Sequence, residues 1–556
     1  MRTQQLSGLR ALAYIAVNGL LEEPAHFALM VSRRLSSAAG FMKLSSLLEA
    51  LLDSKLVPKS NARLRTLSAI YLLKGSPQLS LKIIESDESG RGHVARARAL
   101  FFLGEHEQAI YEVRRAGGKG RRLERLIAAE MEVLTGVYSG LKSGGTQQNS
   151  RRAALHLVTN SLPFTNSGYT QRTHSVLSSI HETGWEILAY SRIGYPWNVG
   201  QLPISDVSKV DNIEYRRLLP KRLPASQLGR VTLQTSMLRD AVRLQSPSIL
   251  HTTTEFVNGI SVGTVAAESG LPWIYEVRGQ LADTWLSACS ERSPESFKYR
   301  HFKESEAEVA KAASAVITLG EAMKQELVEA GVDTSKILVC PNAVGEEYIS
   351  SLPQKSECRR ELGLNDSHLY VGTVSSLVGY EGLDLLVRSF AELADEIKNL
   401  RLLIVGDGTE RDALMSLAKD LGVADRSIFP GRVEKSLARK YHRSLDVFVV
   451  PRRDLAVTRV VTPLKPVEAL AYEVPVVVSD LPALREIVTD GEDGFYFIPE
   501  DQTDLVLKLR LLLNDASLRE RMGSAGREKI LCTRTWARNA ANISDLYDQL
   551  TGQSKS

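Results

Sequence analysis

Residues 451–486 read PRRDLAVTRVVTPLKPVEALAYEVPVVVSDLPALRE, and this stretch sets the fold of the region around it. A short apolar run ends at Pro451, and a loop rich in Arg, Thr and Pro leads to a helical segment at 467–471. A second apolar run, 475–478, follows at once. Open α/β sheets build a nucleotide site from a strand, a loop, a helix with a carboxylate in its first turns and a further strand. The stretch therefore predicts a ligand site at the carboxyl ends of parallel strands.

The alternation of apolar strands and helical patterns extends far on both sides of this stretch. It predicts two doubly wound α/β domains, 151–341 and 342–533, facing a cleft, and a last helix within 534–556 that can cross back to the first domain. Residues 201–230 show no pattern that assigns them. The expected strands are 155–158, 185–190, 248–251, 273–277, 315–319 and 337–339, then 369–374, 402–405, 427–429, 447–450, 475–478 and 494–497.

Residues 1–141 are predicted to form an all-helical extension, because apolar residues recur at spacings of three and four without strand alternation. The segment 93–116 resembles a tetratricopeptide unit, with a Leu103-Gly104 turn between its helices, and a weaker copy covers 63–84. Helix-pair repeats bury surface only against neighbours, so the extension is either a docking platform or a structural cap. Polar, Gly-containing residues 142–150 are predicted to be a linker.

The composition is that of a globular protein, with 43% hydrophobic and 24% charged residues. No run of about 18 uncharged apolar residues occurs, and no signal-peptide pattern is found, so we expect a cytoplasmic protein without a transmembrane helix. The cysteines have no paired spacing, which argues against a disulfide framework or a zinc site and fits a reducing compartment. They are Cys289, Cys340, Cys358 and Cys532.

Basic charge is concentrated in the first 150 residues, which hold 21 Lys and Arg against 13 Asp and Glu. The remainder of the chain holds 48 against 52. A basic region attracts anionic partners, although a solvated helical face explains the same charge. We expect residues 1–141 to contact an anionic membrane surface, peripherally on the inner face of the plasma membrane, or a protein partner, and we expect no nucleic-acid partner.

Six short motifs follow one another in a fixed order over roughly residues 151–545. The motifs are SLPFTNSGYTQRTH (161–174), SRIGYP (191–196), YEVRG (275–279), YEGLDL (380–385), VGDG (405–408) and VTPLKPVEAL (461–470). The set resembles glycosyltransferase family 4, in particular the bacterial exopolysaccharide and cell-envelope branch whose motif reads TPLKPLEAM. The resemblance implies the two-Rossmann GT-B architecture, a UDP- or GDP-sugar donor, no required metal or cofactor, and retention of anomeric configuration.

The resemblance also implies which residue holds the donor ribose. Glu468 matches the second carboxylate of the family's E-x7-E motif, which accepts hydrogen bonds from the ribose hydroxyls. A first-turn Glu stabilised by the helix dipole is the alternative interpretation of Glu468. Val460 stands where the first carboxylate of that motif falls.

The cations that hold the donor phosphates are also altered. The family's usual Arg and Lys fall at Ser376 and Glu381 in this chain. Lys465 is the leading replacement and Arg452 the second, because a departing diphosphate requires cationic stabilisation. We expect Ser375 and Ser376 to lie beside the donor as well. Arg453 is expected to be a solvated loop charge.

Other motif residues are assigned by the same resemblance. Gly168 falls where the first Rossmann turn approaches the donor or acceptor closely, although a plain turn glycine is the alternative. Tyr169, Arg172 and His174 follow it and would face the acceptor. Arg278 is also expected on the acceptor side. With Glu276 it forms a charged pair that either has a role in function or is only a mutual salt bridge.

The catalytic group remains open at this point. Related sequences often read H-x-H where this chain has His251-Thr-Thr253, so Thr253 replaces the second His. Lys465, Arg452 and His251 are candidate catalytic residues, and a core-edge position is the alternative for His251. Retaining enzymes of this class pass through an oxocarbenium-like step without an obvious protein nucleophile.

The sequence thus predicts a retaining glycosyltransferase that acts on a cell-envelope glycan or lipid-linked acceptor. Departures at Val460, Ser376, Glu381 and Thr253 are also what a non-catalytic GT-B scaffold with a helical docking domain would show. A protein glycosyltransferase and a sugar-nucleotide epimerase are the further alternatives.

Overall fold

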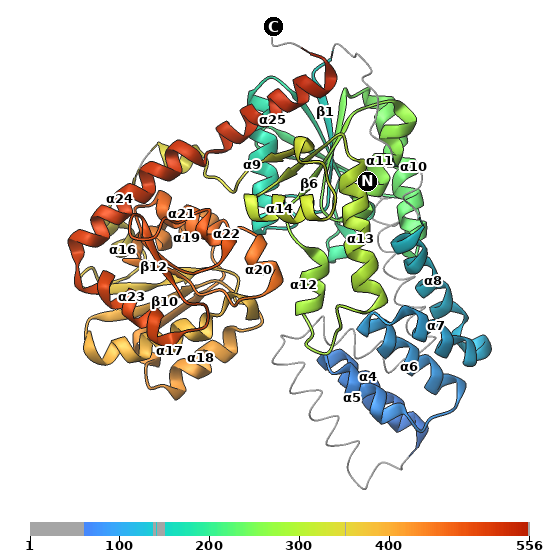
Figure 1. Ribbon diagram of the computed structural model, residues 1–556, viewed down its shortest axis with the longest axis horizontal. Coiled ribbons are helices and arrows are strands. Elements are labelled where there is room, and N and C mark those ends of the chain that lie inside the picture. The colour runs from blue at the N-terminus through green and yellow to red at the C-terminus, as the bar shows by residue number, and fades with distance from the viewer. Residues whose placement is uncertain (1–59, 137–140, 142–150, 351, 554–556) are drawn as a thin grey trace.

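A computed structural model of the chain describes residues 60–136, 141, 151–350 and 352–553. Figure 1 shows a helical extension and two α/β domains, and the predicted fold class is confirmed. Residues 1–59 of the predicted extension and the predicted linker 142–150 lie outside the described residues.

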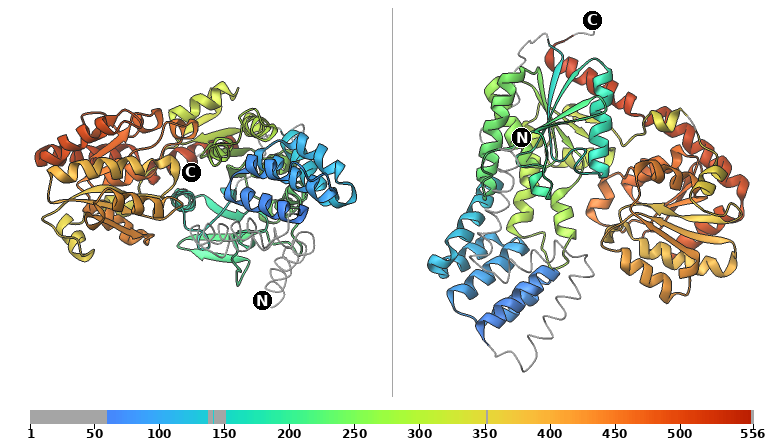
Figure 2. Two further views of the ribbon diagram at one scale, coloured as in Figure 1. Left: turned by 90° about the horizontal axis from the view of Figure 1, so that it is seen from below. Right: turned by 180° about the vertical axis from the view of Figure 1, so that it is seen from behind.

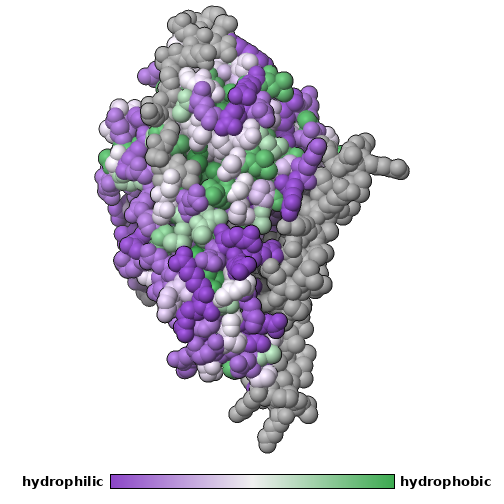
Figure 3. All heavy atoms as spheres, turned by 90° about the vertical axis from the view of Figure 1, so that its right-hand side faces the viewer, coloured by the Kyte–Doolittle hydropathy of each residue, from purple (hydrophilic) through white to green (hydrophobic). Residues whose placement is uncertain are grey.

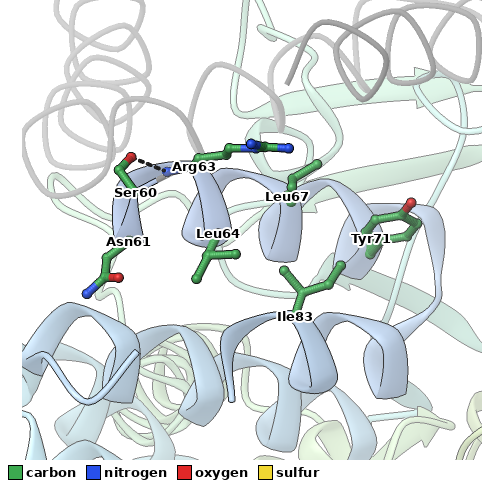
Figure 4. Close-up of a pocket in the computed structure, with 7 residues that line it drawn as sticks. All are labelled: Ser60, Asn61, Arg63, Leu64, Leu67, Tyr71 and Ile83. Atoms are coloured by element: carbon green, nitrogen blue, oxygen red, sulfur yellow. Dashed lines mark hydrogen bonds between the residues drawn. The ribbon is translucent and has the colours of Figure 1, made fainter. Parts of the chain in front are cut away.

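The extension is built from antiparallel helix pairs. Helices α4 and α6 each end at a glycine with positive φ, Gly75 at 87° and Gly104 at 88°. In Figure 4, Leu64 of α4 and Ile83 of α5 point toward one another between their helices. The tetratricopeptide resemblance itself stays a prediction. The helices are α4 (Asn61–Lys74), α5 (Pro77–Ile84), α6 (Gly90–Leu103), α7 (His106–Arg115) and α8 (Arg121–Thr135).

The extension shares a hydrophobic core with the first α/β domain. Val133 and Leu134 of α8 belong to the same buried cluster as Leu238 and Phe302 of that domain. The Lys298 ammonium lies 2.6 Å from Glu130 Oε1 of α8 and adds a polar contact at the same junction. A structural role for the extension follows from this shared core. Figure 3 shows the side on which α8 and α10 lie, where hydrophilic residues predominate over the lower part.

The N-terminal α/β domain has an eight-stranded sheet in the order β3-β4-β2-β1-β5-β6-β7-β8. All strand pairs are parallel except β3 with β4, a hairpin at 207–217. It lies within the region 201–230, to which the sequence pattern assigned no element. Its elements are β1 (Ala153–Val158), α9 (Gly168–Glu182), β2 (Glu186–Ser191), β3 (Val207–Val210), β4 (Ile213–Arg217), α10 (Gln227–Gln245), β5 (Ile249–Thr253), α11 (Phe256–Ser269), β6 (Trp273–Val277), α12 (Leu281–Ser287), α13 (Phe297–Ala312), β7 (Ala315–Thr318), α14 (Glu321–Glu329) and β8 (Ile337–Val339).

The C-terminal α/β domain has a six-stranded parallel sheet in the order β11-β10-β9-β12-β13-β14. Strands β12 and β13 are buried along their whole length, as expected for strands covered on both faces. Its elements are α15 (Glu346–Ile349), α16 (Lys355–Glu361), β9 (Leu369–Val374), α17 (Leu383–Glu396), β10 (Leu400–Val405), α18 (Arg411–Asp420), β11 (Ser427–Gly431), α19 (Lys435–Ser444), β12 (Val447–Val450), α20 (Ala456–Val460), α21 (Lys465–Ala471), β13 (Val476–Ser479), α22 (Pro482–Arg485), β14 (Gly494–Phe497), α23 (Gln502–Asn514) and α24 (Ala516–Thr533).

The last helix, α25 (Trp536–Thr551), leaves the C-terminal domain and packs on the N-terminal one (Figures 1 and 2). It contacts α9 and β5, and the Tyr547 hydroxyl lies 2.6 Å from Nδ1 of His251. The two domains are therefore joined by the chain near Pro341 and by this returning helix.

Candidate functional site

A cleft of about 580 Å³ lies between the two α/β domains. The first turn of α9, the end of β6 and α12 contribute residues from the N-terminal domain, and α20, α21 and the loop between them contribute residues from the C-terminal domain. Nine residues that the sequence singled out line the cleft: Gly168, Tyr169, Arg172, Arg278, Ser376, Glu381, Arg452, Lys465 and Glu468.

Both predicted phosphate-binding cations converge on Glu381. Lys465 Nζ lies 2.7 Å from Glu381 Oε1 and donates to Ser375 Oγ at 2.6 Å. Arg452 Nη2 donates to the same Oε1 at 3.2 Å, and its Nη1 donates to the carbonyl of Val461. Burial alone would raise the pKa of Glu381, but the two cations outweigh it and lower the pKa to about 2. The cluster is therefore an ionised carboxylate between two charged partners.

Glu468 lies at the first turn of α21 in the same cleft. Its Oε1 accepts a hydrogen bond from the Tyr348 hydroxyl at 2.9 Å, and its Oε2 lies 3.6 Å from Nε2 of His442. Burial raises the pKa of Glu468, and the hydrogen bond from Tyr348 opposes that rise. Burial also lowers the pKa of His442 to about 3, so His442 is neutral and does not pair as a cation.

Sequence reasoning missed both neighbours of Glu468. His442 lies in the last turn of α19, whose charged residues are Lys and Arg. A single His on such a basic helix was the available signal. Tyr348 comes from the short helix α15, 120 residues before Glu468, and nothing in its local pattern connects the two.

The opposite wall begins at the N-terminus of α9. Ser167 caps this helix, and its side chain and that of Thr170 form a capping box. A Cβ atom on Gly168 would meet no heavy atom within 4 Å, so the backbone is accessible to a ligand there. The neighbouring Tyr169 side chain is 54% exposed and lines the cleft.

Arg172 and Arg278 are held by a buried carboxylate. Arg172 Nη2 lies 3.0 Å and Arg278 Nη2 2.5 Å from the Glu276 carboxylate. Burial would raise the pKa of Glu276, but Arg278 and Arg172 outweigh it and hold the pKa well below its usual range. Arg172 also donates to the backbone carbonyls of Cys340 and Pro341. Arg172 thus holds the segment near Pro341 that connects the two domains. Of the two interpretations of Glu276 and Arg278, the mutual salt bridge is the one observed.

The structure does not bring every predicted residue to the cleft. His174 contacts Asp211 and Tyr215, at 2.8 and 3.0 Å, and is absent from the residues that line the cleft. His251 is buried against Tyr547 and Glu276 and is absent from the cleft lining too. His251 therefore occupies a position in the core and not in the cleft. Thr253 lies at the end of the same buried strand.

Val460, at the position of the family's first carboxylate, is buried at the domain interface. It is 7% exposed and belongs to the hydrophobic cluster of the N-terminal domain. Helix α20, which carries it, contacts α12 and α14. An ionised carboxylate at this position would be buried among apolar side chains, which is unfavourable without a partner.

Arg453 is a surface residue, as its motif position suggested. Its side chain is 41% exposed, and it pairs with Asp384 and donates to the carbonyl of Gly379. In the part of the chain that the structure describes, no group of three or more His, Cys, Asp and Glu is placed to hold a metal ion. None of the described helices combines the length and apolar character needed to cross a membrane.

Two family models match the chain in succession. Residues 167–343 match the model described as glycosyl transferase 4-like domain, and residues 354–529 match glycosyl transferases group 1. The first match ends two residues after Pro341, whose carbonyl accepts a hydrogen bond from Arg172.

Curated relatives are similar over parts of their length. A GDP-mannose-dependent alpha-(1-6)-phosphatidylinositol monomannoside mannosyltransferase of Mycolicibacterium smegmatis is 30% identical over 41% of this chain and 57% of its own length. A D-inositol 3-phosphate glycosyltransferase of Stackebrandtia nassauensis is 28% identical over 52% of this chain and 66% of its own length. The chain thus spans less than two thirds of these relatives.

Solved structures share the fold at low sequence identity. Sucrose-phosphate synthase of Thermosynechococcus elongatus has a TM-score of 0.60 at 19% identity, covering 72% of this chain and 100% of its own. Anabaena HepE in complex with UDP has a TM-score of 0.55 at 16% identity, covering 71% and 100%. The solved structures show the GT-B fold. The two domain models, which together cover more than half of the chain, show that it belongs to the glycosyltransferases, with a 4-like domain followed by a group 1 domain.

Proposed function

We propose that this protein is a retaining glycosyltransferase that moves a sugar from a nucleoside-diphosphate-sugar to a cell-envelope glycan or a lipid-linked acceptor. One observation carries the proposal: Glu468, Lys465 and Arg452 line a single interdomain cleft opposite the start of α9. An anion beside two cations suits a ribose diol next to a diphosphate.

Each residue has a chemical role in this proposal. Glu468 accepts hydrogen bonds from the ribose hydroxyls, while Lys465 and Arg452 stabilise the diphosphate. The bond between the anomeric carbon and the diphosphate oxygen breaks, and its electron pair leaves with the diphosphate. The acceptor oxygen bonds to the same face of the anomeric carbon, and its proton passes to the departing diphosphate oxygen. We propose no protein nucleophile and no metal, because the two cations supply the charge that the leaving group requires.

The acceptor is placed on the N-terminal side, near Gly168 and Tyr169. The names of related proteins support this substrate class, since they include phosphatidylinositol and inositol-phosphate acceptors and GDP-mannose as a donor. A protein of the same fold has been solved in complex with UDP-glucose. Domain closure over the cleft would exclude water and limit hydrolysis of the donor.

The helical extension is proposed to contact an anionic membrane surface beside the acceptor. Five basic residues around the turn between α7 and α8 are exposed: Arg114, Arg115, Lys119, Arg121 and Arg125. Binding to anionic vesicles should weaken as salt is added. Because α8 belongs to the core of the next domain, the full chain is required for this measurement. Binding that is insensitive to salt would contradict an electrostatic contact, and retention of a protein from solution instead would favour a protein partner.

The central test is calorimetric titration of the full chain with UDP- and GDP-sugars, with Glu468→Ala as the site variant. We expect binding by the wild type that weakens at least tenfold in the variant. Absence of binding in both would exclude the enzyme and favour a scaffold. Transfer with EDTA present, followed by NMR of the product anomer, tests metal independence and retention. Epimerisation of the donor without an acceptor would instead favour the epimerase alternative.

A further inference from the structure

We propose that Glu381 is a positioning residue that holds the phosphate-binding cations in the free protein and limits how tightly the diphosphate product is retained. The inference rests on the proposed function and names a regulatory element of the same site. Glu381 stands where the family's usual Lys falls, and this Lys is not needed here. Lys465 and Arg452 pair with Glu381 in the free protein and contact the donor instead once it binds.

The contacts of the two cations carry the inference. Lys465 Nζ is within hydrogen-bond distance of Glu381 and Ser375. Arg452 directs Nε and Nη2 to the Glu381 carboxylate and Nη1 to the Val461 carbonyl. Both cations line the cleft, so a diphosphate that enters it meets charges already partly neutralised.

The Glu381 carboxylate is fixed by the backbone around it. The residue ends a short 3-10 turn, and Gly382 follows with φ of 65°. A Cβ on Gly382 would stand 2.0 Å from the Pro451 carbonyl, so this turn packs directly on the end of β12. Two residues after Pro451, Arg453 donates its backbone amide to the Tyr380 carbonyl at 3.0 Å. The carboxylate therefore stays in place while the flexible Lys465 side chain can turn toward a ligand.

The Glu381 carboxylate weakens binding of the diphosphate product and stabilisation of the transition state to different extents. The leaving diphosphate gains negative charge as the glycosidic bond breaks, and Lys465 can then move from Glu381 toward it. Interactions that strengthen only as charge develops raise turnover, whereas uniform binding of the diphosphate slows its release. Glu381 thus weakens ground-state and product binding more than it weakens stabilisation of the transition state.

The test compares the wild type with Glu381→Gln, which keeps the shape and removes the charge. Asp384→Asn is the matched control, because Asp384 is a carboxylate three residues away that pairs with Arg453 outside the cleft. UDP and GDP are titrated by calorimetry, and kcat and KM are measured with the sugar nucleotide that the wild type uses. We expect Glu381→Gln to bind the diphosphate at least tenfold more tightly, with lower KM and lower kcat, and Asp384→Asn to match the wild type.

A folding defect is separated from this effect by a second measurement. The two unpaired cations should lower the melting temperature of Glu381→Gln, and inorganic pyrophosphate should raise it more than it raises that of the wild type. Glu381→Asp should restore most of the wild-type kcat and diphosphate affinity. A merely structural role for Glu381 predicts weaker diphosphate binding and no enhanced rescue.

The failures of the two proposals are distinguishable. A wild type that binds no UDP, GDP or sugar nucleotide would overturn the proposed function and this inference with it. A wild type that binds diphosphate while Glu381→Gln binds it no more tightly would overturn this inference alone.

Discussion

Gly320 and Glu486 are in direct contact across the domain interface. A Cβ on Gly320 would stand 2.2 Å from Oε2 of Glu486, and the φ of Gly320 is extended, so space rather than conformation requires glycine. The Glu486 oxygens accept hydrogen bonds from the backbone amides of Glu321 and Ala322 at 2.9 and 2.8 Å. A carboxylate of one domain thereby caps helix α14 of the other, where the helix dipole favours an anion.

Gly320→Ala should therefore open the cleft. The added methyl displaces the Glu486 carboxylate, and loss of a helix cap costs about 1 kcal/mol, or roughly fivefold in the closed population. We expect the donor KM to rise by that factor and small-angle scattering to report a larger radius of gyration. Gly118→Ala, where a Cβ meets nothing within 4 Å, is the control. Unchanged dimensions and KM would mean that the contact does not set closure.

Loss of either cleft cation should reduce catalysis far more than loss of the arginine beside them. Removing one preorganised group that stabilises charge in the transition state typically raises the activation free energy by about 3–4 kcal/mol. Lys465→Ala and Arg452→Ala should therefore each lower kcat/KM by roughly 100- to 1,000-fold. Arg453→Ala should change it less than about fivefold, because surface ion pairs contribute little. Comparable losses in all three variants would refute the assignment of the cations.

Donor affinity should depend on the ionisation of Glu468. Because burial raises the pKa of Glu468, this carboxyl gains its proton at a higher pH than an ordinary Glu. Its loss of charge weakens hydrogen bonds from the ribose, so donor affinity should fall as pH decreases through that raised pKa. Glu468→Gln should bind the donor about 10- to 100-fold more weakly at neutral pH, with much less dependence on pH. Titrations of both proteins across pH check this, with exposed Glu520→Gln as the control.

The Glu381 cluster should stabilise the protein in a defined pH range. The pKa of Glu381 is lowered from 4.5 to about 2. The stabilisation is therefore complete above pH 4.5 and is lost as the pH falls toward 2. The shift corresponds to about 3 kcal/mol. The stability difference between wild type and Glu381→Gln should therefore shrink as pH falls below 4.5. Calorimetric melting of the C-terminal domain measures it, and a difference that grows in acid would contradict the ion cluster.

The returning helix α25 should be held by a polar contact that has no role in catalysis. Removing the Tyr547 hydroxyl leaves buried His251 Nδ1 and His156 Nε2 without that partner. Tyr547→Phe should destabilise the protein by about 1–3 kcal/mol and leave the donor KM unchanged. Tyr496→Phe is a control for loss of a hydroxyl, because the Tyr496 hydroxyl donates to the backbone carbonyl of Val488 in the C-terminal domain. A large change in KM would instead place this histidine cluster in the site.

The sequence by itself determined the two-domain α/β fold and the position of the cleft. Strands such as 447–450 and 475–478 are short apolar runs buried on both faces, and that pattern is local. The position of Glu468 in the first turn of α21 also follows from local signals, namely a strand, a Pro-containing start and a helical run. The hairpin at 207–217 was missed because its strands are only four and five residues long and include Lys and Arg among few apolar residues.

Tertiary structure alone decided what each polar side chain contacts. Glu381 meets Lys465 across 84 residues, Arg172 meets Glu276 across 104, and Val460 is buried by the other domain. The residue type shows whether a side chain is charged or apolar. The group that this side chain contacts depends on how distant segments of the chain pack together. The sequence therefore indicated residues that line the cleft, and packing determined that Lys465 and Arg452 share the Glu381 carboxylate.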